Sequence, residues 1–206
     1  MTVAIIKYGM GNVASVQKAL KKLNYDSIVT DDISELKRAD ILLLPGVGSF
    51  KKGMENLASS GLIEPLTKEV IEHKKPFIGI CLGMQLIASY GTEPEKIKGL
   101  GWIDGEVLKI TPKEKLRVPH LGWNSVVVKT DNNLYKQSDG QDFYFIHSYH
   151  FKVSNPEDIT LEVNYGDNLV AGVSKGNIHA MQFHPEKSQE VGMHLLKNVL
   201  ESYAKK

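Results

Sequence analysis

The sequence predicts an α/β fold in which a mostly parallel, doubly wound sheet carries helices on both faces and an added antiparallel, hairpin-rich region. Three observations favour it. Short apolar runs alternate with helix-spaced stretches in the first half, the later runs are short and separated by turn signals, and the chain closes on a strand followed by a helix. No Pro/Gly/Ser-rich linker, repeat or low-complexity tract interrupts the 206 residues, so we expect one domain over residues 1–206.

The first half has the pattern of repeated strand–crossover–strand units. Residues 3–6 form an apolar run, the turn Gly9-Met-Gly11 follows, and apolar residues then recur at helical spacing from Val13 to Leu23. Such units place their strands side by side and parallel. The next expected elements are a strand at 27–29, a helix at 33–38, a strand at 41–44, a helical region from about 50 to 74 broken near Gly61 and Pro65, a strand at 77–80 and a helical stretch at 82–90.

The second half changes texture. Between residues 101 and 176, turn signals such as Asp104-Gly105, Asp139-Gly140 and Gly166-Asp167 separate short alternating runs, which predicts hairpins and antiparallel strands added to the sheet. The chain then returns to a strand at 178–183 and a helix from about 188 to 204.

Composition excludes several function classes. The chain has 25 Lys+Arg, 24 Asp+Glu and a net charge of +1, and the charges are interspersed, which argues against a polybasic nucleic-acid groove or a membrane-surface patch. The apolar runs are too short to cross a bilayer, so we expect a soluble cytoplasmic protein. A single cysteine, Cys81, excludes an internal disulfide and a multi-cysteine zinc site; we expect no metal and no cofactor.

Cys81 lies in the segment Gly79-Ile-Cys-Leu-Gly83, which has the Gly-x-nucleophile-x-Gly form between an apolar strand and a helix. A sharp strand-to-helix turn needs small residues two positions either side of a nucleophile held in strained backbone. The start of a helix also stabilises a thiolate. Buried packing, the alternative, would explain the cysteine but not the two glycines.

His184 is the best candidate for the base that a thiol nucleophile requires. It ends an apolar strand and precedes Pro185-Glu186, and an extended segment would present His184 and Glu186 on the same side. On this segment alone, a loop histidine beside an incidental glutamate is an equal alternative, and the Cys81 turn favours the base. The amides of the Pro45 to Gly48 loop could stabilise an oxyanion, although this loop taken alone is more simply explained as a tight strand-to-helix turn. The argument is convergence: all three segments follow strands whose carboxyl ends meet at one edge of a parallel sheet.

Two longer motifs, Gly79-Ile-Cys-Leu-Gly-Met-Gln85 and Gln182-Phe-His-Pro-Glu-Lys-Ser188, resemble those of the triad-type, class I glutamine amidotransferases. Further motifs narrow the resemblance to the glutaminase subunits of imidazole glycerol phosphate synthase, and together they cover essentially the whole chain. These motifs are Tyr8-Gly-Met-Gly-Asn12, Leu44-Pro-Gly-Val-Gly48, Pro119-His-Leu-Gly-Trp-Asn124 and Phe145-Ile-His-Ser-Tyr149.

The resemblance implies that Cys81 attacks the side-chain amide of L-glutamine, that His184 moves protons and that Glu186 orients His184. It further implies an oxyanion held by the amide of Leu82 and an amide of the loop containing Val47 and Gly48. In the family this loop is thought to reach its working geometry only when the partner's site is occupied. Glutamine binding carries over to Gly46, Gln85, Glu93, Ser148 and Tyr149, although Gln85 and Glu93 could also be merely solvated.

The resemblance also implies a partner, a (β/α)8 cyclase subunit that receives ammonia and makes imidazole glycerol phosphate and an aminoimidazole carboxamide ribotide. The expected interface comprises Tyr8, Gly9, Met10, Gly11, Asn12, His120, Trp123, Asn124 and Lys187, with an ordinary core position as the alternative for Trp123.

One residue departs from the family pattern. Lys7 occupies a position that is commonly acidic in the family, so a paralogue that supplies ammonia to a surface-sugar synthase stays open. A cysteine hydrolase with the same turn, such as a peptidase or γ-glutamyl hydrolase, and a non-catalytic binding subunit stay open as well. An intact set of Cys81, His184 and Glu186 argues against the non-catalytic subunit.

Overall fold

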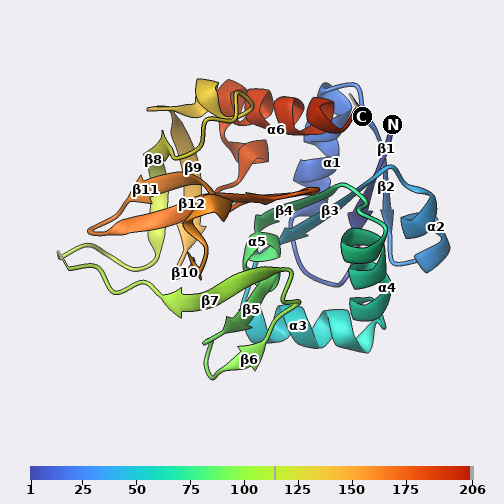
Figure 1. Cartoon of the computed structure of the whole chain (residues 1–206), viewed down its shortest axis with the longest axis horizontal. Coiled ribbons are helices and arrows are strands. Elements are labelled where there is room, and N and C mark those ends of the chain that lie inside the picture. Colours follow the sequence, from blue (N-terminus) through green and yellow to red (C-terminus); the bar gives the residue numbers. More distant parts are fainter. Residues whose placement is uncertain (114, 205–206) are drawn as a thin grey trace.

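A nine-stranded sheet runs through the centre of the computed structural model, which describes residues 1–113 and 115–204 (Figure 1). Its order within the described residues is β2-β1-β3-β4-β13-β12-β11-β8-β9; the first five strands are parallel and the rest are antiparallel. The predicted parallel sheet with an antiparallel extension is confirmed. The bounds are β1 Thr2–Ile6, β2 Asp26–Thr30, β3 Ile41–Gly46, β4 Phe77–Cys81, β8 His120–Val128, β9 Asp142–His147, β11 Ile159–Asn164, β12 Asn168–Lys175 and β13 Ile178–Met181.

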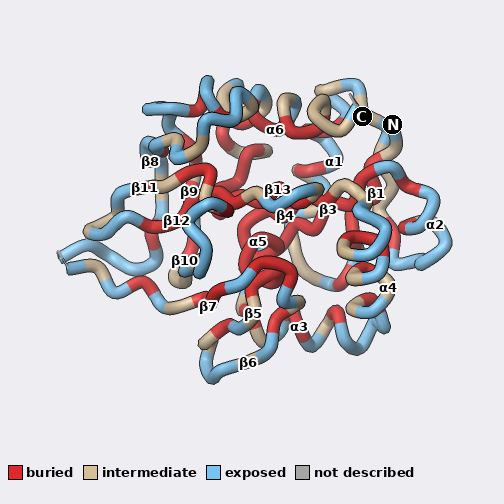
Figure 2. Tube along the Cα trace, in the orientation of Figure 1, coloured by how far each residue is buried: buried red, intermediate tan, exposed pale blue. Residues whose placement is uncertain are grey.

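Continuous apolar strands form the middle of this sheet because both of its faces are covered. In β1, Val3 and Ile5 pack into one hydrophobic core, and Ala4 and Ile6 pack into another on the opposite face. The first core includes residues of α1 and α6, and the second includes residues of the other four α-helices. The helices are α1 Val13–Lys22, α2 Ile33–Arg38, α3 Phe50–Ser59, α4 Ile63–Thr67, α5 Leu82–Leu86 and α6 Gln189–Ala204. Buried residues accordingly concentrate along the central strands and α5 (Figure 2).

Four further strands form a second sheet beside α5 and α3, so the region 101–176 does not all join the central sheet as expected (Figure 1). Its order is β10-β7-β5-β6, and β5 pairs with β7 in parallel. The bounds are β5 Ala88–Gly91, β6 Ile97–Lys98, β7 Ile103–Lys109 and β10 Tyr149–Val153.

The expected helical stretch at 82–90 is wrong beyond Leu86. Helix α5 ends there, and the carbonyls of Leu86 and Ala88 accept hydrogen bonds from Leu100 (2.8 Å) and Gly101 (3.0 Å). These distant amides take the place of the next helical turn, so tertiary pairing overrides the local spacing. The strand expected at 178–183 likewise ends earlier, at Met181.

The helical region at 50–74 contains the predicted break at Gly61, where φ is +66°, but Pro65 does not break it. Pro65 lies in the first turn of α4, where its missing N–H removes no helical hydrogen bond because the residue four positions earlier, Gly61, lies outside the helix. Helix α4 continues into a π-helical turn, Lys68–Glu72. Among the described residues, we find no helix with the length and apolar character that a membrane crossing requires.

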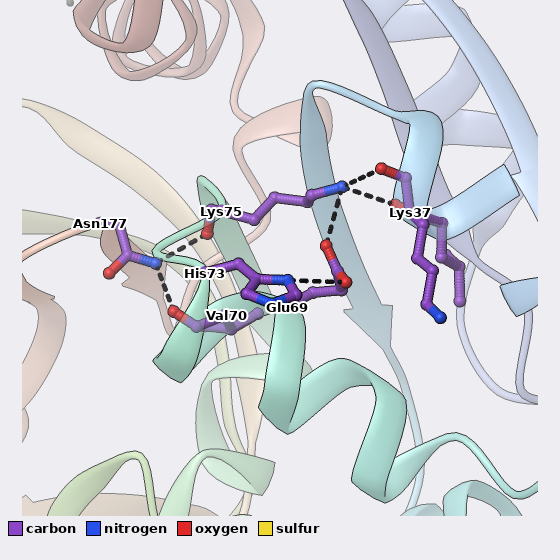
Figure 3. A network of polar contacts seen from close by, with 7 residues as sticks. Lys37, Glu69, Val70, His73, Lys75 and Asn177 are labelled. Carbon is purple, nitrogen blue, oxygen red and sulfur yellow. Dashed lines mark hydrogen bonds and ion pairs between the residues drawn. The ribbon is translucent and has the colours of Figure 1, made fainter. Parts of the chain in front are cut away.

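A polar network connects the segments that lead into the N-terminal ends of β4 and β13 (Figure 3). Asn177 Nδ2 donates to the carbonyls of Val70 (2.9 Å) and Lys75 (2.7 Å), just before the two strands begin. The carboxylate of the buried Glu69 contacts Lys75 Nζ at 3.1 Å and His73 Nδ1 at 3.0 Å. Burial opposes ionisation of Glu69, but hydrogen bonds from Lys75 and His73 outweigh it and lower the pKa of Glu69. The network thus fixes one end of the strand pair whose other end carries Cys81 and the segment of His184.

Candidate functional site

Cys81 ends β4 and immediately precedes α5, with φ +54° and ψ −109°, a backbone conformation that is strained for a residue with a side chain. A Cβ on Gly83 would lie 1.9 Å from the carbonyl oxygen of Leu44, and one on Gly79 would lie 3.0 Å from that of Gly83. Both flanking glycines are therefore required by close backbone approach, as the motif predicts. The turn leaves the thiol at the carboxyl edge of the parallel strands.

His184 and Glu186 form the second part of the site. The Nδ1 atom of His184 lies 2.8 Å from Glu186 Oε1, and each side chain is only 1% exposed. The extended segment expected from the sequence is wrong, because Pro185–Lys187 is a 3-10 turn. This turn, rather than strand alternation, brings the carboxylate back to the imidazole.

The other ring nitrogen of His184, Nε2, is buried and forms no hydrogen bond with any described residue. Burial disfavours the imidazolium, but interactions with the Cys81 thiol and the Glu186 carboxylate outweigh burial and raise the pKa of His184 to about 9. A protonated imidazole between a sulfur and a carboxylate is the arrangement that stores a thiolate and supplies a proton. These three residues can therefore support nucleophilic chemistry.

A cavity of about 270 Å³ opens over the sulfur. Of the residues predicted from the sequence, it brings together Cys81, both oxyanion-loop positions, Leu82 and four of the five expected glutamine-binding residues. Gly46 does not line the cavity; it pairs with Cys81 across β3 and β4, and a Cβ there would lie 2.7 Å from that of Leu82. The lining residues are Val47, Gly48, Cys81, Leu82, Gln85, Glu93, Pro119, Ile146, His147, Ser148 and Tyr149.

Two of the predicted binding residues have protein partners of their own. Glu93 Oε2 accepts a hydrogen bond of 2.9 Å from the amide of Phe50, the first residue of α3. Gln85 Nε2 donates to the carbonyl of Tyr149 and to Gln182 Oε1, each at 2.9 Å. The expectation that these two side chains could be merely solvated is therefore wrong, since both are tied into the cavity wall.

The residues expected at a partner interface divide into exposed and buried ones. Trp123 is 48% exposed on β8, so the core alternative for it is wrong; Gly9 and Asn12 are also exposed, as is Lys7. Met10, Gly11, Asn124 and Lys187 are half-buried, whereas Tyr8 and His120 are buried, Tyr8 with its hydroxyl 2.9 Å from the carbonyl of Pro45.

An exposed apolar strip accompanies Trp123. Leu121 pairs with Ile146 and Trp123 with Tyr144 across β8 and β9, so these four side chains share one face of the sheet. Leu121 and Ile146 are exposed, and Lys187 Nζ lies 5.9 Å from the centre of the Tyr144 ring. We call Leu121, Trp123, Tyr144 and Ile146 the β8–β9 strip.

Sequence reasoning missed several residues of the site. Gln182 and His147 are buried polar residues beside the sulfur and the cavity, and Pro119 and Ile146 line it. A polar residue directly after a buried apolar strand was the available signal for Gln182. Within the part of the chain that the structure describes, no group of three or more His, Cys, Asp or Glu side chains is placed to hold a metal ion.

Comparison with known proteins shows the family to which the chain is similar. A model of the class I glutamine amidotransferases matches residues 4–202. The chain is 44% identical over 199 residues to imidazole glycerol phosphate synthase subunit HisH 1 of Campylobacter jejuni (strain RM1221). The matched region covers 96% of this chain and 98% of that protein. It is 42% identical over 202 residues to subunit HisH 2 of Methanococcus maripaludis, with coverage of 96% and 98%.

Solved structures share the fold. A crystal structure of a glutamine amidotransferase superposes with a TM-score of 0.76 at 20% identity, covering 98% of both chains. Another glutamine amidotransferase, from Thermotoga maritima, gives a TM-score of 0.69 at 17% identity, covering 100% of this chain and 99% of that one.

Proposed function

The chain belongs to the class I glutamine amidotransferase family, and we propose that it is the glutaminase subunit of an imidazole glycerol phosphate synthase. The observation that carries the proposal is the placement of Cys81, which lines the cavity, beside His184, whose other ring nitrogen contacts Glu186. The similarity to the HisH subunits over nearly the whole chain supports the choice within the family.

The chemistry follows from this arrangement. The Cys81 thiolate attacks the side-chain amide carbon of L-glutamine, so a C–S bond forms. Protonated His184 then gives its proton to the leaving nitrogen as the C–N bond breaks, which releases ammonia and leaves a glutamyl thioester. Neutral His184 next takes a proton from water, whose oxygen attacks the thioester; glutamate leaves and the thiolate–imidazolium pair is restored. Glu186 keeps Nδ1 protonated throughout, so that Nε2 does the transfer.

Oxyanion stabilisation and substrate binding are assigned to the cavity wall. We assign the oxyanion to the amide of Leu82 and to an amide of Val47 or Gly48, because both segments line the cavity beside the sulfur. Gln85, Glu93, Ser148 and Tyr149 would hold the amino-acid part of glutamine, and Gly46, which does not line the cavity, allows the close packing of β3 against Leu82.

A partner subunit is the second half of the proposal. Exposed aromatic and aliphatic side chains grouped on one sheet face are typical of interaction sites, and the β8–β9 strip reaches the cavity through Ile146. We propose that a (β/α)8 cyclase docks there, with Gly9 to Asn12, Asn124 and Lys187 around it, and receives ammonia for histidine biosynthesis.

The cytoplasm is the proposed location, because a reducing compartment keeps the Cys81 thiol available as a nucleophile. Lys7 favours a second candidate, the same glutaminase chemistry supplying a different synthase, since its exposed cation lies in the segment leading to the interface loop.

One measurement separates these possibilities. The chain is mixed with the histidine-pathway cyclase and its nucleotide substrate, and glutamate release is measured together with imidazole glycerol phosphate formation. Coupled formation of both products supports the proposal. Glutamate release without the second product points to another acceptor synthase, and no release under any condition contradicts the glutaminase.

A further inference from the structure

Gln182 lies directly opposite the nucleophile. Strands β4 and β13 pair in parallel with Ile80 against Met181. The next residues along the chain are Cys81, the last of β4, and Gln182, the first after β13. Gln182 is completely buried. Its backbone N–H donates to the carbonyl of Ala171 at 2.9 Å, which keeps this residue aligned with the neighbouring strand β12. A buried amide side chain requires partners, and the reaction described above gives this one no part.

The hydrogen bonds around Gln182 determine which end of its amide faces the sulfur. Gln85 Nε2 lies 2.9 Å from the carbonyl oxygen of Tyr149, an acceptor only, so this atom of Gln85 is the nitrogen. The same nitrogen lies 2.9 Å from Gln182 Oε1, which must therefore be the oxygen. Gln182 Nε2 consequently points the other way, 3.6 Å from Cys81 Sγ.

The carbonyl of Tyr149 is itself held by a chain of histidines. His147 Nδ1 lies 2.8 Å from this oxygen and therefore carries a proton, and its Nε2 lies 3.1 Å from His120 Nδ1. The far nitrogen of His120 lies 3.3 Å from Asn124 Nδ2, which also donates to the carbonyl of Asn164 at 3.0 Å. Each imidazole then donates a hydrogen bond through Nδ1 and accepts one at Nε2, so both imidazoles are neutral. Burial also favours a neutral His147, because it lowers the pKa of this residue to about 3.

We propose that Gln182 is a positioning residue for the nucleophile: its side-chain N–H donates to Cys81 Sγ and stabilises the thiolate in line with the cavity. The inference rests on the proposed function and adds a residue to it. Gln182 makes and breaks no bond; it supplies a donor to the sulfur in addition to His184, whereas the Ile146 carbonyl, 3.9 Å from the sulfur, can only accept. Donors to an ionised acceptor are roughly twice as strong as neutral hydrogen bonds, which makes the anion the form that gains.

The titratable groups around the sulfur come from several elements. His184 follows β13 and Tyr8 follows β1; burial and the negative charge of Cys81 raise the pKa of Tyr8 far above its usual range, so the phenol stays neutral. Glu186 contacts His184, and His147 lies near enough to His184 for their charges to interact. None of these groups changes when Gln182 is replaced by an uncharged side chain without a donor, so a shift in thiol reactivity in such a variant reports on the Gln182 donor.

The test is the pH profile of alkylation of the full chain by iodoacetamide, which reacts with the thiolate and needs neither glutamine nor a partner. Gln182→Met keeps the volume and removes the donor. Gln182→Glu keeps an acceptor for Gln85 and turns an oxygen toward the sulfur. We expect both profiles to move to higher pH by about one unit, a roughly tenfold loss of thiolate at a fixed pH on the rising limb.

Asn177→Leu is the matched control, because it removes a buried side-chain amide at the other end of β13, where Asn177 donates to Val70 and Lys75. This variant should lose stability and keep the wild-type profile. Unchanged profiles in the two Gln182 variants, or an equal shift in Asn177→Leu, overturn the proposal. If Gln182→Met does not fold, Gln182→Leu, which also removes the donor without adding a charge, carries the test. Absence of glutaminase activity with the partner would instead contradict the proposed function, which this assay does not involve.

Discussion

His184 Nδ1 lies 2.8 Å from Glu186 Oε1 although only Pro185 separates the two residues, because a 3-10 turn folds the carboxylate back onto the ring. Both side chains are buried, so little water solvates the carboxylate. Its negative charge therefore stabilises the protonated form of the imidazole. The opposite ring nitrogen is thereby left for the thiol of Cys81.

Glu186→Gln should slow glutamate release while leaving the fold intact. The amide no longer stabilises the imidazolium, so the pKa of His184 should fall from about 9 and the proton for the leaving nitrogen is held less often. We expect a loss of roughly 10²- to 10⁴-fold in turnover, the range that a positioned acid–base group contributes. Steady-state rates with the partner, measured across pH, check this.

Glu190→Gln, an exposed substitution in the first turn of α6, serves as the control and should turn over like wild type. Wild-type turnover in Glu186→Gln would show that the carboxylate has no role in orienting His184.

Gly83→Ala should destabilise the chain by about 3 kcal/mol or more, because its methyl group would lie 1.9 Å from the carbonyl of Leu44 and the backbone must move. The control is Gly61→Ala, where φ is +66° and nothing lies within 4 Å of the added carbon, so only the backbone strain of roughly 1–2 kcal/mol is expected. Urea unfolding measures both, and equal losses would contradict the close approach behind the Cys81 turn.

Acid should destabilise the protein through its buried histidines. Burial lowers the pKa of His120 to about 4 and that of His147 to about 3, against 6.5 in the unfolded chain. Between pH 6.5 and about 4 the unfolded state therefore binds more protons than the folded state, and the free energy of unfolding falls as the pH is lowered.

His147→Phe should reduce this pH dependence, whereas His194→Phe, an exposed position on α6, should leave it unchanged. Urea unfolding at pH 7 and pH 5 gives, for each protein, the slope of the free energy of unfolding against pH. Equal slopes in wild type and His147→Phe would mean that this imidazole is not held neutral by the fold.

The β8–β9 strip should carry much of the affinity for the partner. Trp123→Ala and Leu121→Asp remove or charge exposed apolar side chains, so partner binding should weaken by roughly 10- to 100-fold with little change in the free energy of unfolding. Val127→Asp is the control on the same strand, also exposed but outside the strip. Titration calorimetry with the cyclase measures all three, and undiminished affinity in the first two would exclude this surface as the interface.

Much of the central sheet was predictable because strands covered on both faces leave continuous apolar runs, as at residues 41–44, and because close backbone contacts leave glycines, as at Gly79 and Gly83. The candidate nucleophile and its base could be selected from the same local signals. The individual binding and interface roles came instead from the family resemblance, since no local pattern distinguishes Glu93 or Ser148 from an ordinary loop residue.

Other features depend on contacts that the sequence does not display. Ala88 to Tyr90 is predicted as helical, and only pairing with residues that follow later in the chain makes this segment part of β5. The exposure of Trp123 follows from its register on β8, and the orientation of Gln182 from two hydrogen bonds to Gln85 and Cys81. Such features are set by tertiary neighbours, which no single segment encodes.

The central claim is that Cys81 releases ammonia from glutamine for use by a partner subunit, and Cys81→Ala in the assembled complex tests it most directly. Formation of the partner's product is measured with glutamine and, separately, with an ammonium salt. We expect the variant to lose glutamine-dependent synthesis completely and to keep the wild-type rate with ammonium. Glutamine-dependent synthesis that survives in Cys81→Ala would contradict the account.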